Sequence, residues 1–137
     1  MEDAIIRIRD VKKYYQMGSE AIYAVDGISL NIRQGEILCL LGKSGSGKST
    51  LLNLIAGLEK PTEGKIIFHK KHMERMDEDQ LALFRREYVG FVFQSYNLLP
   101  TLTALENVAL PLIFRGMPVK ERNEKAMEML KAVGLED

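Results

Sequence analysis

Hydrophobic and polar residues alternate in two stretches near the start of the chain. Isoleucines alternate with arginines over residues 6–8, and apolar residues alternate with polar ones over 28–32. A period of two predicts strands with one buried face. Gln34-Gly35 then predicts a turn, and residues 65–68 predict a further short strand.

Two other stretches are continuously apolar. Ile37 to Leu41 is bounded by Gly42, and Val89 to Phe93 ends at a polar glutamine. The first run is typical of a central strand that is buried on both faces of a parallel sheet. The second run is expected to be another apolar strand. The single cysteine, Cys39, is expected to be a buried core thiol, and one cysteine excludes an internal disulfide.

The period changes to that of a helix after residue 48, where leucines and isoleucine recur at helical spacing as far as residue 58. Asp77 is placed to cap a helix over residues 78–86. The chain thus reads as strand-rich first and α/β in the middle.

The last third predicts two further helices. Thr103 and Glu106 fit a capping box at the start of one, which Pro111 is expected to kink or end. Pro118 suits the first turn of the next helix, and Gly134 is expected to stop it.

Composition and charge narrow the class of protein. The chain has 137 residues, of which 46% are hydrophobic and 28% charged, the mix of a globular protein. Nineteen basic and nineteen acidic residues give zero net charge, so binding to nucleic acid is not indicated. The most apolar stretch, residues 98–114, contains a glutamate and two prolines and is a poor membrane span. The acidic start does not resemble a signal peptide, and a cytoplasmic location is expected.

The strongest chemical signal is the stretch 42–50, Gly-Lys-Ser-Gly-Ser-Gly-Lys-Ser-Thr, which satisfies G-x-x-x-x-G-K-[ST]. Glycines let backbone N–H groups turn inward around phosphate oxygens, and the following helix points its positive end at them. Lys48 supplies a positive charge for the β- and γ-phosphates, and the Ser49 hydroxyl is suited to Mg²⁺. The predicted phosphate-binding residues are Gly42, Ser44, Gly45, Ser46, Gly47, Lys48, Ser49 and Thr50.

The loop alone indicates a nucleoside triphosphate and is shared by GTPases, kinases and many ATPases. The guanine-binding tetrapeptide Asn-Lys-x-Asp does not occur in the chain, and no arginine-bearing lid of a nucleotide kinase is recognisable. His69 and His72 lie three residues apart in a lysine-rich stretch, which fits a solvated loop better than a metal site.

Further motifs surround the loop. They are Val-Lys-Lys-Tyr-Tyr at 11–15, Val-Asp-Gly-Ile-Ser-Leu at 25–30, Gly-Glu at 35–36, the phosphate loop, Gly-Leu-Glu-Lys-Pro-Thr-Glu-Gly at 57–64, Arg-Arg at 85–86, Gly-Phe-Val-Phe-Gln at 90–94, Asn-Leu-Leu-Pro at 97–100 and Glu-Asn-Val at 106–108. With these motifs the chain resembles the ATP-binding subunit of an ABC transporter, most of all the class that serves lipoprotein release, macrolide efflux and antimicrobial-peptide resistance. The resemblance implies an α/β fold: a P-loop NTPase core with N-terminal antiparallel strands over 1–94, and the start of a helical subdomain over 95–137.

The resemblance also implies roles for single residues. Tyr15 matches the aromatic residue that stacks on adenine, with Tyr14 as the competing candidate. Gln94 matches the glutamine that opens the Q-loop and reaches Mg²⁺ and the attacking water, so Lys48 and Gln94 are the expected catalytic residues and Ser49 and Gln94 the expected metal ligands. Lys43 stands where the class very often has proline, and we expect its side chain to face solvent.

The family couples binding and hydrolysis of MgATP to export. The implied partners are a transmembrane permease subunit at the inner face of the membrane and a second ATP-binding subunit. The family's Leu-Ser-Gly-Gly-Gln signature, its Asp-Glu carboxylates and its switch histidine do not occur within the 137 residues. The expectation is therefore an N-terminal portion, about three-fifths of a larger ATPase domain, with a non-hydrolysing nucleotide-binding or partner-binding fragment as the alternative. The 36–41 strand is then expected to have open neighbours, which predicts marginal stability or association through that edge.

Overall fold

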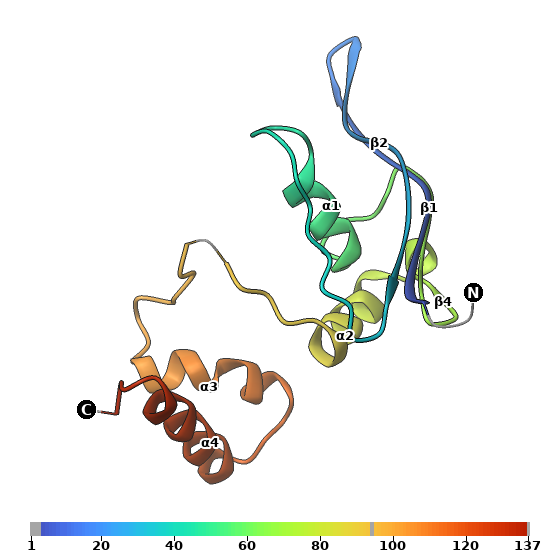
Figure 1. The fold of residues 1–137 in the computed structure, drawn as a ribbon. Coiled ribbons are helices and arrows are strands. Elements are labelled where there is room, and N and C mark those ends of the chain that lie inside the picture. The colour runs from blue at the N-terminus through green and yellow to red at the C-terminus, as the bar shows by residue number, and fades with distance from the viewer. Residues whose placement is uncertain (1–3, 94, 137) are drawn as a thin grey trace. The chain divides into compact units, whose positions relative to one another are not determined.

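The computed structural model describes residues 4–93 and 95–136. The chain divides into two compact units between Arg85 and Arg86 (Figure 1). The division of the chain into 1–94 and 95–137 stays a prediction.

One antiparallel sheet organises the first unit. Its strands are β1 (Ala4–Met17), β2 (Glu20–Arg33), β3 (Glu63–Phe68) and β4 (Lys71–His72), in the order β2-β1-β3-β4. β1 and β2 form a long hairpin that closes through Gly18, whose φ of 63° suits a residue without a side chain. The strands predicted from alternation at 6–8 and 28–32, and the short strand predicted at 65–68, are confirmed.

Three helical segments accompany this sheet: α1 (Lys48–Ile55), the short 3-10 helix η1 (Met73–Arg75) and α2 (Glu78–Tyr88). The predicted cap of α2 is confirmed, because the Gln80 N–H donates to the Asp77 carboxylate at 2.8 Å. Phe68 of β3 packs edge-on against Phe84 of α2, with ring centroids 5.0 Å apart. The buried side chains of this unit are Ile8, Val11, Val25, Leu51, Leu54, Ala56, Ile66, Phe68, Met73, Leu81 and Phe84.

The second unit contains α3 (Ala104–Phe114) and α4 (Val119–Ala132). The capping box is confirmed: the Glu106 N–H donates to the Thr103 hydroxyl, and the Thr103 N–H donates to the Glu106 carboxylate. α3 continues through Pro111 to Phe114, so the proline does not end the helix, and Pro118 lies one residue before α4, as its N-cap.

Glycines end both helices of this unit in the same way. The N–H of Gly134 donates to the Lys131 carbonyl and that of Leu135 to the Leu130 carbonyl, which is the Schellman arrangement. Gly116 ends α3 with the same pair of bonds, and both glycines have a positive φ. The predicted stop at Gly134 is confirmed.

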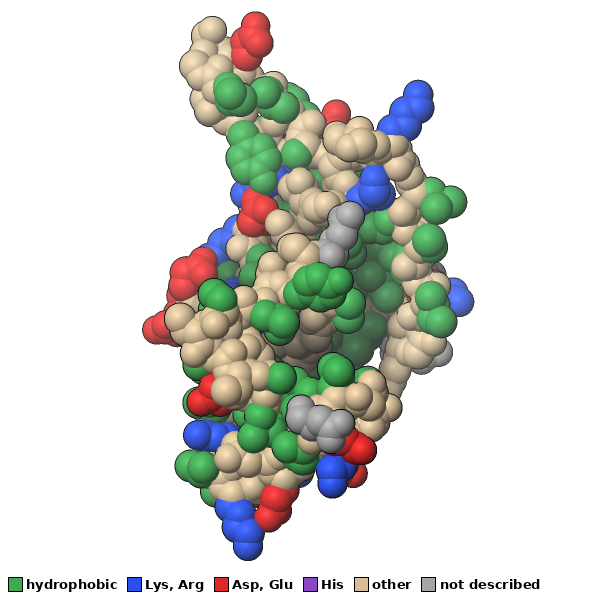
Figure 2. Space-filling model, turned by 90° about the vertical axis from the view of Figure 1, so that its left-hand side faces the viewer, with side chains coloured by type: hydrophobic (Ala, Val, Ile, Leu, Met, Phe, Trp, Pro, Cys, Tyr) green, Lys and Arg blue, Asp and Glu red, His purple; other side chains and the backbone are tan. Residues whose placement is uncertain are grey.

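Two predicted strands are absent from the described residues. Residues 37–41 and 89–93 form neither strand nor helix. The prediction that residues 37–41 are buried on both faces is also wrong, since Ile37 is 97% exposed and Leu41 91%. In the second run, Val92 is 99% exposed. Cys39, expected in the core, is exposed. Hydrophobic side chains at the surface are visible in Figure 2.

Hydrogen bonding explains this difference. A central parallel strand is held by neighbours on both sides. The sheet of the described residues consists of β1 to β4 and offers neither apolar run a partner. Because residues 37–41 form no strand, the expected strand with open neighbours at 36–41 is absent, and association through this edge stays a prediction. Over the described ranges, no helix combines the length and the hydropathy needed to cross a membrane.

Asn107 fastens the turn that leads into α3. Its side-chain oxygen accepts from the Leu99 N–H at 2.8 Å, and its amide nitrogen donates to the carbonyls of Leu99, Leu102 and Thr103 at 3.0–3.1 Å. A single asparagine side chain thus adds to the one backbone bond of this turn, in which the Leu102 N–H donates to the Leu99 carbonyl at 3.1 Å.

Replacing Asn107 by alanine is expected to loosen this turn without unfolding the chain. Each net hydrogen bond contributes about 0.5–1.5 kcal/mol, so loss of the set should speed amide exchange at Leu99 roughly tenfold or more. Hydrogen exchange of the variant measures this. Asn123→Ala, at an exposed asparagine of α4, is the control and should leave the rate unchanged. Equal exchange in both variants would contradict the proposed role of Asn107.

Candidate functional site

The glycine-rich loop lies between the end of the exposed segment 37–41 and the first turn of α1. The Ser46 N–H donates to the Lys43 carbonyl at 3.2 Å, which closes a tight turn. Gly45 and Gly47 have φ values of 78° and 70°, in the left-handed region that side chains disfavour. This is why glycine is needed at both positions.

At Gly47 there is also no space for a side chain. A Cβ built there would lie 1.7 Å from the carbonyl oxygen of Ala24 in β2. At the other end of the loop, a Cβ on Gly42 would lie 2.4 Å from the Ser46 Oγ. The loop is therefore folded back on itself and pressed against the hairpin, and glycines make both close approaches possible.

Lys48, the first residue of α1, folds back over this loop. Its ammonium donates to the carbonyls of Gly42 and Lys43, each at 3.0 Å. An ammonium has three N–H donors, so one is left for a ligand at the loop. Ser49 follows with an exposed side chain and Thr50 with a half-exposed one, both in the first turn of α1. Lys43 is exposed, as expected.

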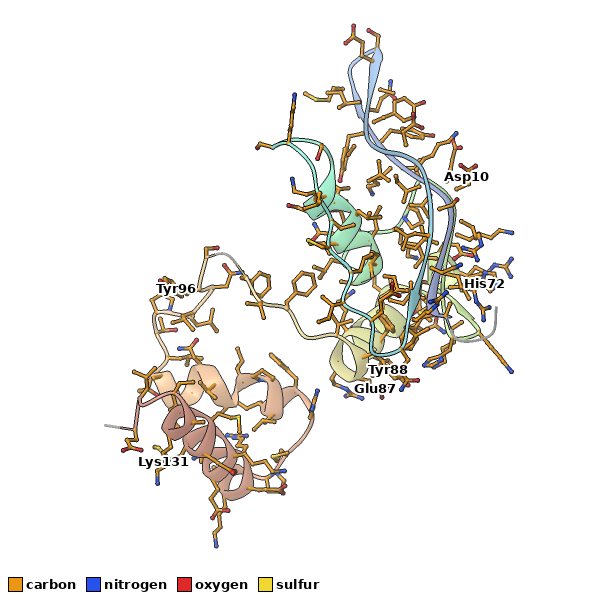
Figure 3. All side chains as sticks on the ribbon, in the orientation of Figure 1. Asp10, His72, Glu87, Tyr88, Tyr96 and Lys131 are labelled. Atoms are coloured by element: carbon orange, nitrogen blue, oxygen red, sulfur yellow. The ribbon has the colours of Figure 1, made fainter. Side chains whose placement is uncertain are left out.

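Residues 42–50 thus form a tight turn that leads directly into the first turn of α1. The first N–H groups of a helix have no partner within the helix, and together with a lysine ammonium they suit an anion with several oxygens. Figure 3 shows the side chains of this region on the ribbon.

Tyr15 and Tyr14, the two candidates for the adenine contact, have different surroundings. Tyr14 packs against Tyr23 across the hairpin, with ring centroids 5.2 Å apart. Tyr15 is 42% exposed, and its hydroxyl donates to the Glu59 carboxylate at 2.7 Å. The partly open ring of Tyr15 is better suited to stack on a base, which favours it over Tyr14.

The hydrogen bond between Tyr15 and Glu59 shifts the pKa of both groups. It is the main reason that the pKa of the Tyr15 phenol is raised, and burial adds to this, while the Thr50 hydroxyl acts in the opposite direction. It is also the main reason that the pKa of Glu59 is lowered. At neutral pH the phenol therefore keeps its proton and the carboxylate its charge, and the bond would be lost as pH falls through the lowered pKa of Glu59.

Gln94, predicted to contact Mg²⁺ and the attacking water, lies outside the described residues. The two histidines do not form a metal site. His72, labelled in Figure 3, contacts the Glu74 carboxylate at 2.8 Å, and His69 packs against Phe68. Over residues 4–93 and 95–136, no group of three His, Cys, Asp or Glu side chains is placed to hold a metal ion.

Comparison with known proteins decides the family. Residues 25–137 match the ABC transporter family. The chain belongs to this family. The resemblance predicted from the motifs is confirmed, and the ABC ATPases bind ATP and hydrolyse it as a family.

Named relatives include members of the predicted class. An uncharacterized ABC transporter ATP-binding protein, MJ0796 of Methanocaldococcus jannaschii, is 48% identical over 97% of this chain and 58% of its own length. The lipoprotein-releasing system ATP-binding protein LolD of Legionella pneumophila is 44% identical over 98% of this chain and 60% of its own. The macrolide export ATP-binding/permease protein MacB of Hyphomonas neptunium is 44% identical over 98% of this chain and 21% of its own.

Solved structures confirm the fold class. The post-hydrolysis dimer of the MJ0796 cassette, bound to ADP and Pi, matches with a TM-score of 0.86 at 49% identity, over 92% of this chain and 56% of that one. The described sheet and helices are thus the corresponding part of an ABC ATPase. The chain thus spans between a half and two-thirds of the length of MJ0796 and of LolD.

The sequence alone indicated no role for Glu59, although this residue lies within the motif at 57–64. Its contacts come from Lys13 and Tyr15 of β1, more than forty residues away, and from Asn53 of α1. The sequence carries no pattern that links these positions. Only the pairing of β1 with the elements around it brings them together.

Proposed function

We propose that this ABC ATPase chain binds MgATP, with the triphosphate in the loop 42–50 and the adenine against Tyr15. The observation that carries the proposal is the folded loop itself, with left-handed glycines and the Lys48 ammonium held at its mouth. Lys48 attracts the phosphate charge through its remaining donor, and the N-terminus of α1 adds its partial positive charge.

The oxygen donors available to Mg²⁺ in this proposal are the Ser49 hydroxyl and the Gln94 side chain. Hydroxyl and amide oxygens suit Mg²⁺, which prefers hard oxygen ligands and keeps several from phosphate and water. The exposed position of Ser49 next to Lys48 agrees with such a role. The bound ion would neutralise phosphate charge, and Gln94 would orient the attacking water.

The proposed setting is an exporter. We infer that the chain is part of the ATP-binding component, which meets a transmembrane permease subunit at the inner face of the membrane and pairs with a second ATP-binding subunit. The names of LolD and MacB, which refer to lipoprotein release and macrolide export, and the dimeric MJ0796 cassette support this proposal.

A competition experiment tests nucleotide binding by the chain. MgATP should displace a fluorescent ATP analogue, and magnesium tripolyphosphate should compete more weakly because it lacks the base. Stacking on an aromatic side chain contributes about 1–3 kcal/mol, so Tyr15→Ala should remove most of the difference between the two ligands. Tyr14→Ala is the matched control and should preserve it. Equal competition by both ligands with the unaltered chain would contradict an adenine site.

Binding of nucleotide or of a partner without hydrolysis is the second candidate function. Measurement of phosphate release from MgATP separates the two functions. Release that disappears in Lys48→Ala supports hydrolysis, whereas MgATP binding without release supports the second candidate.

A further inference from the structure

The Glu59 carboxylate joins three elements of the first unit at one point. It accepts the Tyr15 hydroxyl at 2.7 Å and the Asn53 amide at 3.1 Å, and it lies 3.4 Å from the Lys13 ammonium. Lys13 and Tyr15 belong to β1, Asn53 belongs to α1, and Glu59 lies in the turn that follows α1. We call Lys13, Tyr15, Asn53 and Glu59 the Tyr15 cluster.

Glu59 restrains the position of the Tyr15 ring. A hydrogen bond from a hydroxyl to a carboxylate is charge-assisted and stronger than a neutral one. A second bond, from Asn53, fixes the carboxylate in turn, so that the phenol is tethered to α1. A half-exposed tyrosine on a strand would otherwise exchange between rotamers.

Lys13 restricts which face of the ring is open. Its ammonium lies over the Tyr15 ring, 5.2 Å from the ring centroid, and donates to the Lys60 carbonyl at 2.9 Å. Because Lys13 also pairs with Glu59, the cation is held in place from two sides. One face of the ring is therefore covered by the cation, which leaves the opposite face for a flat ligand.

The cluster also connects the ring to the phosphate loop. Asn53, which donates to the Glu59 carboxylate at 3.1 Å, lies in α1, the helix that begins at Lys48. A ring held at this point keeps a fixed distance and orientation relative to the first turn of α1. The base and the phosphates of one nucleotide can bind together only if their two contact points keep such a fixed separation.

We propose that Glu59 is a positioning residue for the nucleotide base, which holds Tyr15 against Lys13 so that one ring face stacks on the base while the phosphates occupy the loop. This rests on the proposed function, since it takes Tyr15 to be the adenine contact. It adds a residue that does not itself touch the nucleotide and that sets affinity for the base alone.

The test compares base-dependent and base-independent binding in variants of the whole chain. Glu59→Gln removes the charge with little change in size, and Glu59→Ala removes the acceptor. The matched control is Glu63→Gln, because the Glu63 carboxylate also pairs with a lysine of β1, Lys12 at 3.2 Å, which is not a member of the Tyr15 cluster. Binding of MgATP and of magnesium tripolyphosphate is measured for each, and circular dichroism checks that each variant is folded.

Both Glu59 variants are expected to bind MgATP about tenfold more weakly, a factor that corresponds to 1.4 kcal/mol, and tripolyphosphate within about twofold of the unaltered chain. Tyr15→Phe, which keeps the ring and removes the donor, should show a similar loss. Combining it with Glu59→Gln should add little further, since both changes break the same contact. Glu63→Gln should bind both ligands normally.

Three results would overturn the proposal. Equal loss for both ligands would show that Glu59 supports the fold and not the base. Unchanged MgATP binding in Glu59→Gln, alongside a clear loss in Tyr15→Ala, would remove Glu59 and leave the adenine site intact. Unchanged MgATP binding in Tyr15→Ala itself would refute the adenine site, and the role of Glu59 with it.

Discussion

Replacing Gly47 by alanine is expected to abolish ATP binding. The added methyl group would lie 1.7 Å from the Ala24 carbonyl oxygen, far inside van der Waals contact, and the φ of 70° disfavours any side chain. Ala24 cannot retreat easily, because residues on both sides of it pair with β1. The loop must therefore move, and we expect MgATP affinity to fall at least ~100-fold, or about 2.8 kcal/mol. Titration calorimetry measures this directly.

Gly45→Ala is the matched control for that experiment. Gly45 has the same left-handed backbone, with a φ of 78°, but a Cβ there would meet no atom within 4 Å. Only the backbone strain remains, which costs about 1–2 kcal/mol, so the variant should keep measurable binding. If Gly47→Ala bound MgATP as well as Gly45→Ala does, the close approach to β2 would not be what shapes the loop.

Lys48→Ala is expected to have the second large effect. The substitution removes the ammonium that bonds the Gly42 and Lys43 carbonyls and the donor left for phosphate. A hydrogen bond to a charged group contributes about 1.5–3 kcal/mol, so the affinity for MgATP should fall by roughly 10- to 150-fold. The affinity for tripolyphosphate should fall as much, since the contact is to phosphate.

Lys43→Ala removes the same charge from the same loop and serves as the control. Its side chain is exposed, and only its backbone carbonyl takes part in the contacts of Lys48. Binding of MgATP should stay within about twofold, because exposed charges contribute little. Similar losses in the two lysine variants would mean that net charge, and not the placement of Lys48, attracts the phosphate.

Elements with a local signal could be predicted well. The strands of the hairpin alternate with period two, and the Asp77 and Thr103 caps lie three residues from their partners. Gly134 stops α4 by bonds within six residues. Each of these structures is stabilised by residues close to it in the sequence, so the local sequence pattern is enough to predict it.

The two apolar runs show why other parts could not be predicted. Residues 37–41 and 89–93 have the composition of buried strands, but a strand of this kind exists only beside its hydrogen-bonded neighbours. The described sheet provides none, and Cys39 and Ile37 are exposed. Composition predicted the preferred surroundings of these residues, not the surroundings that they have.

In the candidate site, too, some residues could be predicted from the sequence and others could not. Residues 42–50 are contiguous, so the motif predicted the loop, and the resemblance singled out Tyr15. The Glu59 carboxylate could not be predicted, because its contacts join β1, α1 and the turn after α1.

The contact between Gly47 and Ala24 has a consequence for the order of folding. The β1–β2 hairpin closes through a two-residue turn and needs only local contacts, so it can form early. The phosphate loop takes its shape against the Ala24 carbonyl, which is in place only once that hairpin exists. Nucleotide binding should therefore appear after the hairpin during refolding, and changes that slow the hairpin should delay both.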